Sequence, residues 1–140
     1  MAYTIASAPE SCPHPIGKLD HPIVLRYLES INLGNFSEAV RLFDPRGALQ
    51  PPFEIPIVGQ TSILAYLREE YRDVELIPER YSSAVGSNGR LQITVFGKAR
   101  IPWFGSKADI DQIWRFFLLP NGSISLLSIE TLLEPEKTAG

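Results

Sequence analysis

The chain has 140 residues, the length of a single domain, with 44% hydrophobic and 21% charged residues and a formal net charge of -3. Its composition is that of a globular protein, and no apolar run approaches the ~20 residues that a membrane-spanning helix needs. The negative charge and scattered basic residues argue against nucleic-acid binding. The first residues lack the charged and apolar regions of a secretory signal, which predicts a cytoplasmic protein.

Cysteine and histidine are too few to predict a metal site. Cys12 is the single cysteine, so an intramolecular disulfide and a multi-cysteine site are excluded. His14 and His21 lie near it in sequence, but their spacing matches no common zinc pattern. Two interpretations of Cys12 remain: an ordinary thiol in an N-terminal arm, or a disulfide between the two chains of a dimer.

An extended arm and an amphipathic helix are predicted at the N-terminal end. Three prolines within residues 1–19 forbid a continuous helix there. Asp20 is the predicted N-cap of the first helix, with Pro22 in the first turn and Gly34 at the end. Tyr27 lies on the apolar face of this helix and is expected to be buried.

Two more helices are predicted before the strands begin. Asn35 is the expected N-cap of the second, which ends at a turn over residues 44–47. Residues 47–59 are rich in proline yet apolar, which predicts a packed loop with one or two short strands. The third helix is expected to begin at Gln60 or Thr61, with its inner face ending at Tyr71.

Four long strands are predicted in the second half of the chain. The first covers residues 74–84, and Pro78 indicates an edge or a bulge within it. Alternating residues predict the second strand over 91–103, and a turn over 105–107 leads into the third. One face of the third strand carries Ile110, Gln112, Trp114, Phe116 and Leu118.

The order of elements predicts an α+β fold. Gly86 to Gly89 and Asn121-Gly122 are hairpin turn signals, and the second of them leads into a last strand over residues 123–133. Three helices followed by an antiparallel sheet form two packed layers. A strongly curved sheet over the helices would make a cone that encloses a pocket. Tyr27 and either Trp103 or Trp114 are expected to point into it.

Several uncommon motifs occur in the order and spacing of one known family. They are GALQPPF followed by PIVG, REE followed by LIPER, IPWFG and IWRF. Over about residues 21–133 they resemble the C-terminal domain of the orange carotenoid protein of cyanobacteria, and the chain is similar to the free-standing homologues of that domain. The resemblance implies a nuclear-transport-factor-2-like cone, a curved antiparallel sheet packed on N-terminal helices, over residues 20–133. An extended arm, residues 1–19, and a flexible tail, residues 134–140, flank it.

The resemblance also implies a ketocarotenoid carrier without catalytic residues. The ligand would be canthaxanthin or echinenone, bound non-covalently, with its ring 4-keto oxygen held by the Tyr27 hydroxyl and the Trp114 indole N–H. Trp103 would line the tunnel next to the ring. The other lining positions implied are Val74, Leu76, Ile101, Pro102 and Phe104. One departure is Tyr71, which stands where the full-length family protein has a cysteine.

Further consequences of the resemblance concern partners. It implies transfer of pigment to helical carotenoid proteins, singlet-oxygen quenching in photoprotection, and transient contact with a carotenoid-containing membrane. A domain of this length is about as wide as the pigment is long, roughly 30 Å, so half of the pigment must protrude. We therefore expect a homodimer in which two copies meet mouth to mouth around one pigment.

Two alternatives to a carrier remain open from the sequence. The first is an enzyme on the same fold, of the isomerase or dehydratase type, which needs a general base in the pocket. Asp109 and Asp111 are predicted on the strand face opposite Trp114, and both histidines precede the cone, so Glu130 is the remaining candidate base. The second is a dimerisation module with no ligand.

Overall fold

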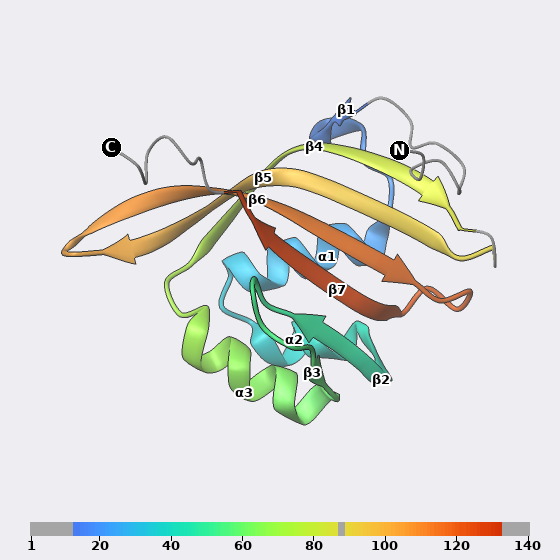
Figure 1. Ribbon diagram of the computed structural model, residues 1–140, viewed down its shortest axis with the longest axis horizontal. Helices are drawn as coiled ribbons and strands as arrows, with labels where there is room; N and C mark the ends of the chain where they lie inside the picture. The colour runs from blue at the N-terminus through green and yellow to red at the C-terminus, as the bar shows by residue number, and fades with distance from the viewer. Residues whose placement is uncertain (1–12, 87–88, 133–140) are drawn as a thin grey trace.

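The computed structural model describes residues 13–86 and 89–132. In this part of the chain the helices pack against a seven-stranded sheet of order β1-β4-β5-β6-β7-β2-β3 (Figure 1). The elements are β1 (His14–Pro15), the 3-10 helix η2 (Ile16–Lys18), α1 (Pro22–Asn32), α2 (Phe36–Arg41), β2 (Phe43–Gln50), β3 (Ile57–Val58), α3 (Gln60–Glu70), β4 (Glu75–Val85), β5 (Leu91–Trp103), β6 (Ser106–Leu118) and β7 (Ile124–Thr131). The predicted α+β class is confirmed. Cys12, part of the β4–β5 turn and the tail lie outside the described residues.

Helix α1 forms as predicted but begins one residue later. Its N-cap is His21, not Asp20, and Pro22 occupies the first helical position. A residue before proline is pushed into extended backbone, which is the conformation of an N-cap, and His21 has φ -134° and ψ 102°. Gly34 follows the helix with φ +73°, a left-handed conformation that suits glycine at a helix end. The predicted second and third helices are confirmed at α2 and α3.

Strand β2 replaces a predicted turn. Residues 44–47 do not reverse the chain: β2 runs through them, and its register with β7 shifts between Phe43 and Ala48. The backbone N–H of Arg46 donates to Asp44 Oδ2, which closes this bulge locally. Because β2 pairs with β7 in parallel, the sheet is mixed, whereas the four strands β4, β5, β6 and β7 pair with one another antiparallel, as predicted.

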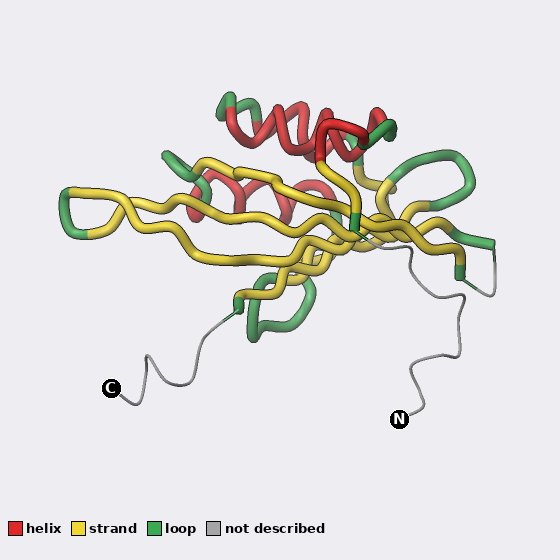
Figure 2. The backbone as a smooth tube through the Cα atoms, turned by 90° about the horizontal axis from the view of Figure 1, so that it is seen from above, coloured by secondary structure: helices red, strands yellow, loops and turns green. Residues whose placement is uncertain are grey.

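The β5–β6 hairpin is the longest pairing in the described sheet. It runs from Leu91 opposite Leu118 to Trp103 opposite Ser106. The turn consists of Phe104 and Gly105, both at positive φ (47° and 76°), the pattern of a type I′ hairpin turn. The sequence predicts that Ser106 and Lys107 belong to the turn. In the structure they are the first two residues of β6. The hairpin end extends past the helices in both views (Figures 1 and 2).

Residues 13–19 belong to the folded domain instead of forming an extended arm. His14 and Pro15 pair with β4 as strand β1, and Leu19 is buried in the core. The Tyr81 hydroxyl donates to the Lys18 carbonyl at 3.2 Å, which fastens this segment to the sheet edge. None of the described helices is both long and apolar enough to span a membrane.

Candidate functional site

The buried face of β6 forms the floor of the candidate site. Trp114 is 2% exposed and Gln112 is 9% exposed, and Phe116 follows on the same face. Side chains two residues apart on a strand point to the same side, so the predicted alternation of this strand is confirmed. Across the sheet, Val95 and Ile129 lie opposite Trp114 on β5 and β7.

Tyr27 brings a hydroxyl into this layer from α1. Its ring packs edge-on against Phe116, with centroids 5.6 Å apart, and against Phe43 at 6.0 Å. The side chain is 2% exposed, and its hydroxyl has no hydrogen-bond partner among the described residues. An unpaired buried hydroxyl costs about 1–3 kcal/mol. The Tyr27 hydroxyl is therefore a buried donor without an acceptor among the described residues.

Trp114 already has an acceptor within the chain. Its Nε1–H donates to Gln112 Oε1 at 2.8 Å, and Gln112 Nε2 donates to Thr131 Oγ1 at 3.2 Å. The family resemblance implies that Tyr27 and Trp114 together bind one carbonyl oxygen. In the structure both residues are buried, and Tyr27 packs against Phe116, which follows Trp114 by two positions on β6. The Trp114 indole N–H, however, donates to Gln112.

A tyrosine cluster, Tyr27, Tyr66 and Tyr71, joins α1 to α3. The Tyr66 and Tyr71 rings lie 6.0 Å apart between centroids. Burial raises the pKa of Tyr27 well above its usual range, and Tyr71 and Tyr66 add to the rise. Burial also raises the pKa of Tyr71, with Tyr66 and Glu70 adding to it, and raises the pKa of Tyr66 to about 12, with Glu54 and Glu70 adding to it. All three phenols are therefore neutral at physiological pH.

Alkaline pH is expected to destabilise the protein through this tyrosine cluster. Tyrosines of the unfolded chain lose their protons near pH ~10, while the cluster stays protonated in the folded state. The folded state then binds more protons, so the free energy of unfolding is unaffected below pH ~10 and falls as the pH rises through about 12, the pKa of Tyr66. Urea unfolding at several pH values checks this. In Tyr66→Phe the free energy of unfolding should fall less steeply with pH than in wild type. Constant stability between about pH 9 and 11 would contradict it.

The other predicted lining residues divide into two groups. Leu76 is buried, and Val74 and Ile101 are half-buried against the core. Trp103 and Phe104 are instead 55% and 90% exposed and pack edge-on against each other. They lie at the end of the β5–β6 hairpin with exposed Pro102, beyond the last residues paired with β4 and β7. The structure therefore does not bring Trp103, Pro102 or Phe104 next to Tyr27.

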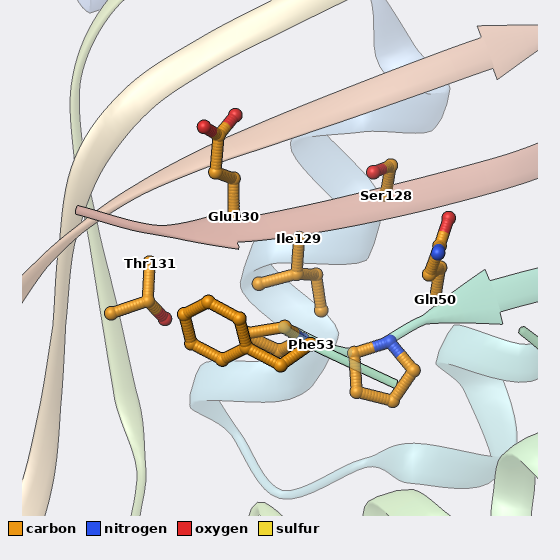
Figure 3. Close-up of a pocket in the computed structure, with 8 residues that line it drawn as sticks. Gln50, Phe53, Ser128, Ile129, Glu130 and Thr131 are labelled. Atoms are coloured by element: carbon orange, nitrogen blue, oxygen red, sulfur yellow. The ribbon is translucent and has the colours of Figure 1, made fainter. Parts of the chain in front are cut away.

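A cavity of about 210 Å³ lies at the end of β7, and its lining includes Ile129 and Thr131 but none of Tyr27, Gln112 and Trp114. It is bounded by the β2–β3 loop and by β7, and the Phe53 side chain lies beside Ile129 and Thr131 (Figure 3). This volume is below the ~300–1,000 Å³ of sites that enclose a whole drug-sized ligand. The residues that line it are Gln50, Pro51, Pro52, Phe53, Ser128, Ile129, Glu130 and Thr131.

The acidic residues considered as general bases form ion pairs. Asp109 and Asp111 bind Arg100 and Lys98, each at 2.8 Å, on the face opposite Trp114, as the alternation predicts. The Arg100 guanidinium holds the pKa of Asp109 below its usual value, the reverse of what a general base requires. Glu130 lies 2.7 Å from Arg115. Within residues 13–86 and 89–132 no cluster of three metal-ligating side chains is found.

The sequence-based prediction assigned no role to Gln112, Ile129 or Phe53. The alternation of β6 places Gln112 next to Trp114 on one strand face, because side chains at i and i+2 of a strand are adjacent. The position of Ile129 opposite Trp114 depends on the β6–β7 register, and the position of Phe53 at the cavity depends on the path of the β2–β3 loop. Neither has a local sequence signal.

Known proteins resemble the chain in both sequence and structure. No protein-family model matches it. It is 41% identical over 114 residues to the orange carotenoid-binding protein of Synechocystis sp. and 40% identical over 114 residues to that of Limnospira maxima. Each match covers 81% of this chain and 36% of the relative. The chain thus spans about a third of the length of these relatives.

Solved structures extend the comparison. The orange carotenoid protein of Anabaena (Nostoc) sp., solved with canthaxanthin, superposes with a TM-score of 0.78 at 36% identity, over 94% of this chain and 45% of that one. An epoxide hydrolase/cyclase-like enzyme superposes at 18% identity with a TM-score of 0.68, over 80% and 89%, which shows the shared fold alone. The chain is a homologue of the C-terminal domain of the orange carotenoid proteins and has their nuclear-transport-factor-2-like fold.

Proposed function

We propose that this protein is a non-enzymatic carrier of a ketocarotenoid such as canthaxanthin or echinenone. The observation that carries the proposal is the Tyr27 hydroxyl, which is buried against Phe116 and Phe43 without a partner among the described residues. A keto oxygen on a terminal ring is an acceptor that this donor can bind within an apolar site. Homology to proteins that bind carotenoid supports the same ligand class.

Apolar contact supplies most of the affinity in this proposal. Burying a few hundred Å² of polyene at ~25 cal/mol per Å² is worth on the order of 5 to 10 kcal/mol. One hydrogen bond contributes about 0.5–1.5 kcal/mol net. The polyene therefore sets the affinity, while the Tyr27 hydroxyl sets the orientation of the ring and the colour of the pigment.

A homodimer that shares one pigment is part of the proposal. The cavity beside Ile129, about 210 Å³, is too small for a whole carotenoid, so most of the polyene would need to be covered by another surface. Two-fold symmetry matches a ligand with two equal ends, as canthaxanthin has. A pigmented protein that elutes as a monomer, with one pigment per chain, would contradict this arrangement.

The carrier is proposed to act in the cytoplasm, in photoprotection. An exposed half of the pigment can pass to a helical carotenoid protein or be taken up during transient contact with a carotenoid-containing membrane, and bound ketocarotenoid quenches singlet oxygen. Exposed Trp103 and Phe104 at the hairpin end support contact with a second apolar surface.

Expression in bacteria that synthesise canthaxanthin tests the carrier function. A violet or red purified protein, with one pigment for every two chains, is the expected result. Subsequent mixing with a colourless helical carotenoid protein, followed by separation of the two, measures transfer. Colourless protein purified from pigmented cells would refute the proposed function.

A further inference from the structure

Two aromatic side chains are exposed together at the tip of the β5–β6 hairpin. Trp103 is 55% exposed and Phe104 is 90% exposed, and their rings pack edge-on with centroids 4.9 Å apart. The hairpin reaches this point as a two-stranded ribbon, because in the described sheet the β4 pairing ends at Arg100 and the β7 pairing ends at Gln112. The tip projects from the rest of the domain (Figures 1 and 2).

The backbone at Phe104 is an unfavourable place for a large side chain. Phe104 is the first residue of the turn and has φ +47°, a left-handed conformation that favours asparagine and glycine and strains a bulky residue. Its ring lies outside the hydrophobic core and contacts exposed Trp103. Folding alone disfavours both the strain and the exposure, so their coincidence at one residue indicates a functional constraint.

Charged side chains are almost absent from this end of the hairpin. The base of the ribbon carries two cross-strand ion pairs at 2.8 Å, Lys98–Asp111 and Arg100–Asp109. Beyond them, residues 101–108 contain one charged side chain, Lys107, which lies opposite Pro102. From Ile101 to Phe104 the strand rises roughly 10 Å. This length is close to the ~5–10 Å to which amphipathic segments enter the interface of a bilayer.

We propose that the tip from Pro102 to Lys107 is the surface with which this protein docks on a lipid bilayer. Phe104 and Trp103 enter the boundary of the acyl chains, where aromatic side chains are favoured, and Lys107 contacts anionic headgroups. The inference rests on the proposed function, in which pigment is taken up from a membrane, and deepens it by naming the surface that makes the contact.

The size of the tip favours a bilayer over a second copy of the chain. A buried aromatic side chain contributes about 150–250 Å², so the exposed parts of Trp103 and Phe104 amount to roughly 300 Å². A specific protein interface buries about 800 Å² per partner. A bilayer requires no complementary surface. A contact this small is also reversible, which suits a protein that leaves the membrane with its pigment.

Vesicle binding by the full colourless chain tests this inference. The vesicles contain equal parts of phosphatidylcholine and phosphatidylglycerol, and sedimentation measures the bound fraction. Phe104→Asn should lower the affinity about tenfold or more, because it removes the inserted side chain. Asn-Gly is the favoured sequence of this turn, so the variant should be at least as stable to urea as wild type. Phe104→Leu keeps an apolar side chain and should retain most of the binding.

Further variants separate insertion from charge and from simple exposure. Lys107→Gln should weaken binding to these vesicles about fivefold and leave binding to pure phosphatidylcholine unchanged. Val85→Thr removes apolar surface from an exposed residue at the opposite end of β4 and should change neither. Lipid with brominated acyl chains should quench tryptophan emission in wild type and not in Trp103→Phe, because Trp114 is 2% exposed.

Wild-type affinity for vesicles in Phe104→Asn would overturn the inference. If that variant also loses an oligomer on size-exclusion chromatography, the tip contacts a second copy of the chain instead. Where the wild type is pigmented after expression with canthaxanthin, either result leaves the carrier function intact. A wild type that stays colourless but binds vesicles through Phe104 removes the carrier function and keeps the lipid contact.

Discussion

Replacing Tyr27 by phenylalanine is expected to stabilise the protein by about 1 kcal/mol while abolishing its preference for ketocarotenoids. The hydroxyl is buried without a partner among the described residues, so its removal relieves a desolvation penalty of about 1–3 kcal/mol, less any relaxation around it. The same change removes the donor for the ring carbonyl, and the retained ratio of canthaxanthin to β-carotene should fall roughly two- to tenfold. Urea unfolding and pigment analysis measure the two effects.

Tyr81→Phe is the matched control, because the Tyr81 hydroxyl donates to the Lys18 carbonyl. It should destabilise the protein by about 0.5–1.5 kcal/mol, the opposite sign, and leave the pigment ratio unchanged. If Tyr27→Phe destabilises the protein as much as Tyr81→Phe does, the Tyr27 hydroxyl is satisfied within the protein. The free donor on which the proposed function depends would then not exist.

Gly97→Ala is expected to destabilise the protein by about 3 kcal/mol or more. Gly97 lies opposite Pro78 on β4 and Gln112 on β6, beside the register shift between Pro78 and Arg80. A Cβ at this position would overlap the Ile77 carbonyl oxygen and lie 2.9 Å from the Pro78 Cα. Both atoms belong to the backbone, so no change of rotamer can relieve the overlap. Strand β4 must move to accommodate the added methyl group.

Gly17→Ala provides the comparison, since a Cβ at Gly17 would meet nothing within 4 Å. Its free energy of unfolding should stay within about 0.5 kcal/mol of wild type. Urea unfolding of both variants checks the difference. Equal stabilities would mean that β4 is not packed against Gly97 as closely as the structure has it.

Local signals predicted most of the elements. The bulge expected from Pro78 occurs as a register shift in the β4–β5 pairing. Gly34 ends α1 at positive φ, and Gly122 is at positive φ in the last hairpin turn. The errors lie where a distant strand competes with a local signal. Asp44-Pro45-Arg46-Gly47 has the composition of a turn, yet pairing with β7 keeps it within β2 as a bulge.

The sequence by itself determined that Trp114 is buried and that Tyr27 faces the core, because periods of 2 and 3.6 place side chains without knowledge of the partner. The motifs also predicted the family. Only the tertiary structure decided what each aromatic residue does. Trp103 is exposed because the β5–β6 hairpin extends beyond the last residues that pair with β4 and β7. Trp114 donates to Gln112 because the sheet buries both side chains on the same face. The Tyr27 hydroxyl remains without a described partner, since hydrogen bonding depends on three-dimensional neighbours that periodicity does not encode.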